Sequence, residues 1–180
     1  MNAGMTQDVD LANAVLAAWT TSNRVTMFLF ENLPSDMWAM TVPGASRRTV
    51  RMIAGHVHNA RCMWIKTLGR RHGIRVPKSV NRFSVTRREL LPALRRSSNG
   101  VIDLLELGIN HGGRIPASGV AWVNLPVDVV HVLSYLVAHE GHHRGQIVML
   151  ARQTGHRLPV AITGGLWHWT KRAKEALLTR

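Results

Sequence analysis

The sequence predicts an all-α fold, an antiparallel four-helix bundle with a short C-terminal helix, in a single domain that spans residues 1–180. The first observation is that four long segments repeat apolar residues at helical spacing, with few runs of strand-like alternation. The second is that connections containing proline or glycine separate these segments. The third is size, because 180 residues with 46% hydrophobic content are enough for one core and short for two.

The first two helices have clear boundaries in the sequence. The first is expected over about residues 10–32, because a leucine-proline pair follows it. The second is expected over about residues 46–71, with Ser46 as a plausible N-cap and Gly73 just beyond its end.

The third and fourth helices carry stronger signals at their ends. The third is expected over about residues 86–107, opening on T-R-R-E, which has the capping-box pattern. Pro92 lies inside it, so we expect a kink there or a start nearer Pro92. The fourth is expected to begin near Pro126 and to end at Gly155 as a C-cap. The last segment, GGLWHWTKRAKEALL, is expected to add a short amphipathic helix.

The chain is strongly basic, with 23 Lys and Arg residues against 10 Asp and Glu. Between Arg47 and Arg96 fourteen basic residues stand against one acid, Glu89. A field of this sign attracts nucleic acid, anionic lipid or a polyanionic substrate, although a solvated basic surface is the simpler interpretation. Base stacking would need aromatic residues among the charges, and the loop GRRHGIRVPKSVNRF carries only Phe83. Nucleic acid is therefore a candidate partner that the sequence does not favour.

Cys62 is the only cysteine, which excludes an internal disulfide framework and a cysteine-rich zinc finger. A reducing cytoplasm is therefore the expected compartment. The N-terminus lacks a basic region followed by an apolar one, and no stretch approaches ~18 uninterrupted apolar residues. We expect a soluble, unexported protein without a membrane partner, in which histidine and carboxylate hold any metal.

The stretch AHEGHHRGQIVML, residues 138–150, contains H-E-x-x-H, the zinc signature of many metallopeptidases. Its histidines His139 and His143 are four residues apart on one helix face, where both imidazoles can reach one metal ion. The same face holds Tyr135 and Gln146 among apolar residues. Buried imidazoles need a partner, so a metal ion and satisfied core histidines both remain open as explanations.

Glu140 also has two interpretations. It lies about 100° round the helix from His139 and points away from the apolar face, as Arg144 does, while His142 falls on the flank of that face. Glu140 could lean toward a metal site and act as a catalytic base. It could instead form a surface ion pair with Arg144 at i+4.

A catalytic site of this type usually takes three protein ligands, so another helix has to supply the third. In the stretch GHVHNARCMWI, His56 has apolar neighbours on its helix, whereas His58 stands beside Arg51 and Arg61. Nearby arginine disfavours a bound cation, so His56 is the better candidate ligand. The alternative is a histidine at a helix-helix seam.

These motifs resemble those of the DinB family, whose members are four-helix bundles and commonly dimers. The family's helix pattern of a histidine followed eight residues later by an aromatic matches His56 and Trp64, and H-x-x-x-H-R-G-Q matches His139 to Gln146. The resemblance spans essentially the whole chain. It implies a divalent metal held by His56, His139 and His143, and a variable residue at the position of Glu140.

The resemblance further implies a metal-dependent enzyme that performs metal-assisted hydrolysis or thiol-dependent transfer on an unknown small molecule. Characterised relatives include thiol-dependent S-transferases and a thiol-dependent maleylpyruvate isomerase, so a low-molecular-weight thiol is a candidate partner, and a homodimer is expected. Zn or Ni is expected first as the metal, with Fe or Cu as alternatives. Roles beside the ligands or in the pocket are expected for His142, Gln146 and Tyr135.

Two other hypotheses remain. One is a basic helical nucleic-acid-binding or DNA-damage-associated protein that uses the region between Arg47 and Arg96. The other is an H-E-x-x-H metallopeptidase with Glu140 as its base.

Overall fold

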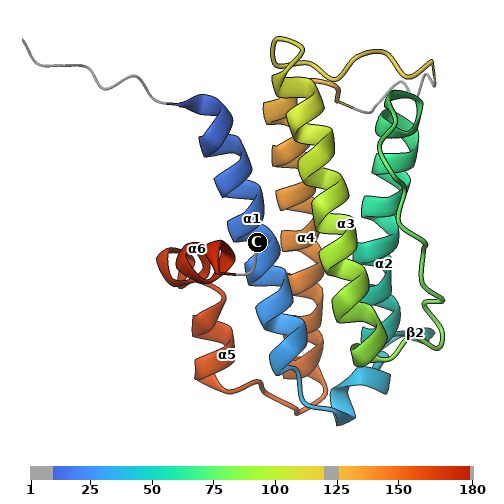
Figure 1. Cartoon of the computed structure of the whole chain (residues 1–180). Coiled ribbons are helices and arrows are strands. Elements are labelled where there is room, and N and C mark those ends of the chain that lie inside the picture. Colours follow the sequence, from blue (N-terminus) through green and yellow to red (C-terminus); the bar gives the residue numbers. More distant parts are fainter. Residues whose placement is uncertain (1–9, 120–125, 179–180) are drawn as a thin grey trace, which may run out of the picture.

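The computed structural model describes residues 10–119 and 126–178, which fold mostly into helices (Figure 1). This confirms the all-α prediction; the described strands form one small antiparallel sheet. A short 3-10 turn precedes the small sheet, and a π segment and a second 3-10 turn follow α2. The elements are α1 (Leu11–Asn32), a 3-10 turn (Asp36–Ala39), β1 (Thr41–Val42), β2 (Ala45–Thr49), α2 (Val50–Trp64), a π segment (Ile65–Gly69), a 3-10 turn (Arg70–His72), α3 (Arg87–Ile109), α4 (Val129–Gln153), α5 (Val160–Gly165) and α6 (Trp169–Leu177).

The four long helices lie side by side, but the chain direction differs from a simple antiparallel series (Figure 1). The helices α1 and α4 run one way, and α2 and α3 run the other. This is possible because residues 73–86 return along α2 before α3 begins. Asn59 on α2 anchors that return, donating to the Val80 carbonyl and accepting from the Val80 amide, both at 2.9 Å. The prediction that neighbouring helices in sequence are antiparallel is therefore wrong for α2 and α3.

The second helix begins later than the sequence predicted. Ser46 lies in β2, and Thr49 is the N-cap, with its hydroxyl accepting from the Met52 amide at 3.3 Å. The β1–β2 hairpin that precedes it was not predicted, because its strands are short and its register is irregular. At the other end the helical turns continue to His72, and Gly73 takes a left-handed φ of 82° as expected for a terminating glycine.

The boundaries of α3 and α4 depend on side-chain caps. The predicted capping box is present, with Thr86 and Glu89 each bonding the backbone of the other. The helix α3 therefore starts at Arg87 and continues through Pro92, so the alternative start nearer Pro92 is wrong. The helix α4 begins at Val129, three residues after the expected start near Pro126, and its cap is Asp128, which accepts from two amides of the first turn. Gly155 follows the helix with φ 78°, as predicted for its C-terminal end.

The C-terminal segment forms the expected short helix, α6, and a second short helix, α5, precedes it. It packs on α1: Arg24 on α1 donates to Glu175 on α6 at 2.8 Å, and the Arg172 guanidinium lies 4.0 Å from the centre of the Phe28 ring. The C-terminal helices thus dock on α1. Within the described part of the chain, every helix falls short of the length and apolarity that crossing a membrane requires.

The core consists of two apolar clusters separated along the helices by a polar layer. One cluster is centred on Phe30, Ile53, Leu94 and Ile147, and the other on Trp19, Trp64, Leu104 and Leu136. Each long helix contributes residues to both clusters and buried polar residues between them. The polar residues are Ser22 and Thr26 on α1, His58 and Arg61 on α2, Ser97 and Ser98 on α3, and Glu140 and His143 on α4.

Candidate metal centre

Three histidines from two helices converge at the level of the polar layer. The Nε2 atom of His139 lies 3.3 Å from Nε2 of His56 and 3.1 Å from Nε2 of His143. One ligand atom from each residue falls within 4.8 Å of the other two, so the group could hold a metal ion. Two nitrogens bound tetrahedrally to one zinc ion at its usual bond length lie about 3.4 Å apart. The observed spacings are therefore close to those of a coordination shell.

The local folding of α2 and α4 explains this convergence. His139 and His143 are one helical turn apart, and their rings meet nearly edge to face with centroids 4.5 Å apart. His56 faces them from α2, which runs antiparallel to α4, with its ring centroid 4.8 Å from that of His143. His143 is buried, while His56 and His139 are half-buried. The site therefore has a closed side toward the core and an open side toward solvent.

Gln146 fixes the orientation of one imidazole. Its side-chain oxygen lies 2.9 Å from Nδ1 of His143, so that nitrogen carries the proton and donates it. The Nε2 atom that faces His139 is then the free lone-pair nitrogen that a metal requires. Arg48 donates to the same Gln146 oxygen at 3.2 Å, which holds the amide in this orientation.

The environment keeps the three imidazoles neutral. Burial, reinforced by the charges of His143, His139, Arg82 and Arg48, lowers the pKa of His56 to about 4. Burial is also the main cause that lowers the pKa of His139 and the pKa of His143. Neutral imidazole is the form that binds metal, so the ligands are ready at neutral pH without losing a proton.

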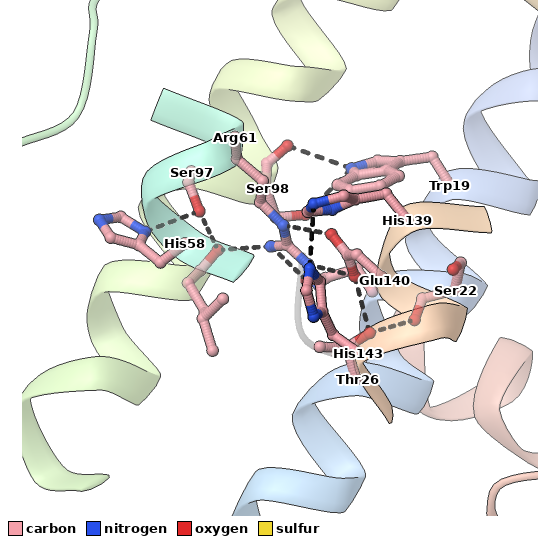
Figure 2. A network of polar contacts seen from close by, with 12 residues as sticks. Trp19, Ser22, Thr26, His58, Arg61, Ser97, Ser98, His139, Glu140 and His143 are labelled. Atoms are coloured by element: carbon pink, nitrogen blue, oxygen red, sulfur yellow. Dashed lines mark hydrogen bonds and ion pairs between the residues drawn. The ribbon is translucent and has the colours of Figure 1, made fainter. Parts of the chain in front are cut away.

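Glu140 lies in the protein interior, although the helix geometry of α4 alone places it away from the apolar face. Its side chain is only 1% exposed, and Arg61 on α2 donates to its two oxygens at 2.6 and 2.8 Å (Figure 2). The Thr26 hydroxyl on α1 donates to it at 2.7 Å. The ion pair expected with Arg144 is present at 4.0 Å, but its expected position at the surface is wrong, because Glu140 is buried and Arg61 is its main partner.

This ion pair and its hydrogen bonds join all four long helices directly beside the histidines. Arg61 also donates to the Asn23 side chain at 2.9 Å and to the Leu94 carbonyl at 3.1 Å, so it reaches α1 and α3. Burial alone would raise the pKa of Glu140, but the Arg61 charge and the hydrogen bonds from Arg61 and Thr26 outweigh it and lower the pKa. Glu140 is therefore an ionised carboxylate with both oxygens occupied.

The remaining predicted site residues surround the histidines. Tyr135 stacks on His139 with an interplanar angle of 9° and centroids 6.0 Å apart, and its ring also contacts Trp64. His142 is exposed and accepts from the Gln146 amide nitrogen at 2.8 Å. Tyr135, Gln146 and His142 thus contact one candidate ligand each, and His142 is also linked to His143 through Gln146.

Two cavities open on either side of His56. One, of about 620 Å³, is lined by the β1–β2 hairpin and the start of α2, with Arg47, Arg48 and Arg82 on its walls. The other, of about 530 Å³, is lined by Met63, Trp64, Tyr135 and His139 among others. Both cavities include His56 and Arg82. A molecule in either cavity would lie against a candidate metal ligand.

Sequence reasoning missed the arginines that complete the site. Arg48 and Arg82 belong to the basic region that was interpreted as one solvated surface, and Arg61 was treated as a reason to reject His58 as a ligand. A signal was present in the serines and threonine of α1 and α3, which occupy apolar faces at the depth of Arg61 and Glu140. Buried hydroxyls at matched depth indicate a polar layer that needs charged partners.

The fold and the site define a mostly helical protein with a three-histidine group that could bind a metal ion. The chain belongs to the DinB family, whose family model matches residues 5–175 and so covers nearly the whole sequence. No curated protein and no solved structure matches the chain.

Proposed function

We propose that this protein is a divalent-metal-dependent enzyme of the DinB type that acts on a small molecule. The metal ligands are His56, His139 and His143, and Zn or Ni is the first expectation, with Fe or Cu as alternatives. The reaction is metal-assisted hydrolysis or thiol-dependent transfer. The observation that carries the proposal is the convergence of three Nε2 atoms from α2 and α4 at spacings close to those of a coordination shell.

The residues around the ligands support this role. A divalent ion in an open three-histidine site supplies Lewis-acid activation of a water or thiol at neutral pH. Gln146 sets the tautomer of His143, and Tyr135 covers one face of the His139 ring. The half-buried state of His56 and His139 leaves a side of the site accessible from the two cavities.

We further propose that Glu140 holds the site together and is not a catalytic base. A base must have an oxygen within reach of the proton that it takes. Both Glu140 oxygens accept charge-assisted or hydroxyl hydrogen bonds, and the side chain is buried. This argues against the H-E-x-x-H peptidase hypothesis, in which the glutamate acts on the nucleophilic water.

The structure also weakens the nucleic-acid hypothesis as an account of the whole basic region. Arg61 is buried in an ion pair, Arg87 donates to the Leu33 carbonyl, and Arg51 donates to the Phe83 carbonyl. These side chains serve the fold and are not available as a continuous phosphate-binding surface.

The assembly and location belong to the same proposal. We propose a four-helix bundle of the crossover type that dimerises and works in the cytoplasm. Large apolar side chains are exposed near α5 and α6, among them Trp167 at 81%, which is consistent with a covered surface in a dimer. Light scattering after size exclusion would measure the mass directly.

Elemental analysis of the purified protein tests the metal site. We expect about one divalent ion per chain in the wild type and a loss of most of it in His56→Ala. The matched control is His111→Ala, whose exposed side chain lies just beyond the end of α3 and bonds only the Leu107 carbonyl among the described groups. It should keep the ion.

The proposal fails if the wild type binds no stoichiometric divalent ion from Zn or Ni solutions. It also fails if His56→Ala and His111→Ala retain equal amounts. A thermal melt with and without added metal provides the second measurement, because an ion that binds only the native state raises Tm.

A further inference from the structure

The larger of the two cavities beside His56 has a strongly positive wall. It lies where the β1–β2 hairpin meets the first turn of α2, and Arg47, Arg48 and Arg82 line it. Arg47 and Arg48 come from β2, whereas Arg82 comes from the segment that returns along α2. Three arginines from two separate segments therefore line one space.

These positive charges have no negative partner in the part of the chain that the structure describes. None of the three arginines forms an ion pair there, and no carboxylate is among the residues that line the cavity. Other arginines of the same chain are paired: Arg24 with Glu31 and Glu175, and Arg61 with Glu140. Like charges around a common space repel one another unless an anion joins them.

The three arginines are not equivalent. Arg48 donates to Gln146, which bonds His143, so it connects the cavity wall to the candidate metal ligands. Arg47 is exposed and Arg82 is half-buried, and neither has a side-chain hydrogen bond to a described residue. These two guanidinium groups are the ones free to bind a ligand.

We propose that the cavity binds an oxyanion, a carboxylate or phosphate group of the small-molecule substrate, through Arg47 and Arg82 beside His56. Guanidinium groups are well suited to such oxyanions because their parallel N–H donors match two oxygens. The second cavity shares His56 and Arg82 but is lined by Met63, Trp64 and Tyr135. The substrate thus has an anionic group on one side of the reacting centre and an apolar or aromatic part on the other.

A phosphate group could also belong to nucleic acid, and the site favours the small molecule. The charges lie in a recess against His56, with the apolar Met52 and Ile53 among its lining residues. Nonspecific binding of single-stranded nucleic acid combines a charged groove with aromatic residues on which bases stack, and the residues that line this cavity include no Phe, Tyr or Trp. The substrate class rests on the proposed function, because the cavity matters for catalysis only if His56 holds a metal.

Anion binding is measured on the full-length protein by calorimetric titration with inorganic phosphate and with succinate, in both metal-free and zinc-loaded samples at low salt. The test variant is Arg47→Gln/Arg82→Gln. The matched control is Arg75→Gln/Arg88→Gln, which removes the same charge from two exposed positions that do not line the cavity. Circular dichroism melts establish that each variant is folded.

We expect both probes to bind the wild type and the control alike, and to bind the test variant about tenfold more weakly or worse. The titration of metal-free protein tests anion binding independently of the proposed metal site, because Arg47 and Arg82 should bind an anion even when no metal ion is bound. Equal binding by the test variant and the control would overturn the inference, as would the absence of phosphate and succinate binding. Binding of a duplex of about 20 base pairs in place of the small anions would assign the charges to nucleic acid and overturn it too.

Discussion

Glu140→Gln removes one negative charge from the polar layer while keeping the length and shape of the side chain. In the wild type, Arg61 donates to both Glu140 oxygens and Thr26 donates to one of them. The variant leaves the Arg61 guanidinium buried without a countercharge and turns an amide N–H₂ toward donors. Removing one partner of a buried ion pair costs about 3–5 kcal/mol. Since Arg61 keeps its bonds to Asn23 and Leu94, we expect about 3 kcal/mol.

Urea unfolding of metal-free protein, followed by circular dichroism, measures this loss directly. The matched control is Glu106→Gln, at an exposed position of α3, which should change the free energy of unfolding by about 0.5 kcal/mol or less. The double variant Arg61→Met/Glu140→Met should be less destabilised than the sum of its single variants, because both charges leave together.

A different result would point to catalysis. If Glu140→Gln unfolds like the wild type but abolishes a metal-dependent activity, the ion pair contributes little and Glu140 acts on substrate. In that case the assignment of Glu140 as a residue that holds the helices together is refuted.

Three further predictions follow from the site and its surroundings. Gln146→Ala should weaken zinc affinity about tenfold to a hundredfold, because the Nδ1 proton of His143 loses its acceptor, and Gln146→Glu should restore the affinity. Equal zinc affinities of the wild type and Gln146→Ala in a competition assay would contradict this. Metal-free protein should lose stability as the pH falls from 6.5 toward 5. In this range the unfolded chain takes up protons on His56, His139 and His143, whereas the folded chain does not, because the fold lowers the pKa of each. A urea midpoint that stays constant from pH 6.5 to 5 would disprove this prediction. Gly108→Ala should cost about 1–3 kcal/mol because its Cβ would overlap Val129, whereas Gly145→Ala, with open space around it, should gain about 0.5–1 kcal/mol; thermal melts of the two variants decide.

Local features of the chain were predictable from the sequence. The capping box at Thr86 and Glu89 depends on residues three apart, and the meeting of His139 and His143 depends on residues four apart. Such patterns are complete within one helix, so reading them needs no knowledge of the partner helices. His56 was identified from its apolar neighbours, and its convergence with the other two histidines agrees with that choice.

Features that depend on two or more helices were not predictable in the same way. The path of residues 73–86 is anchored by Asn59, a single polar residue whose two hydrogen bonds to Val80 leave no periodic signal. The geometry of α4 alone places Glu140 away from the apolar face of that helix. Arg61 on α2 and Thr26 on α1 make that side of α4 an interior surface.

The basic region shows a related difficulty with composition. Composition predicts one solvated basic surface, but the arginines of this region lie in different environments and make different contacts. Arg61 lies in the core, Arg87 bonds the end of α1 through the Leu33 carbonyl, and Arg47 and Arg82 face a cavity. Net charge along a sequence does not determine which charges share a direction in space.

The distance along the chain between the candidate ligands has a consequence for folding. His56 and His139 are 83 residues apart, so one ion bound to both would close a loop that contains the returning segment, all of α3 and the start of α4. In the chain-entropy model a cross-link of that span destabilises the unfolded state by about 4.5 kcal/mol. A chain with one buried cysteine cannot form such a link internally through sulfur. A bound ion would therefore act as a cross-link in place of a disulfide, and the fraction of chains that carry this cross-link would depend on the concentration of free metal.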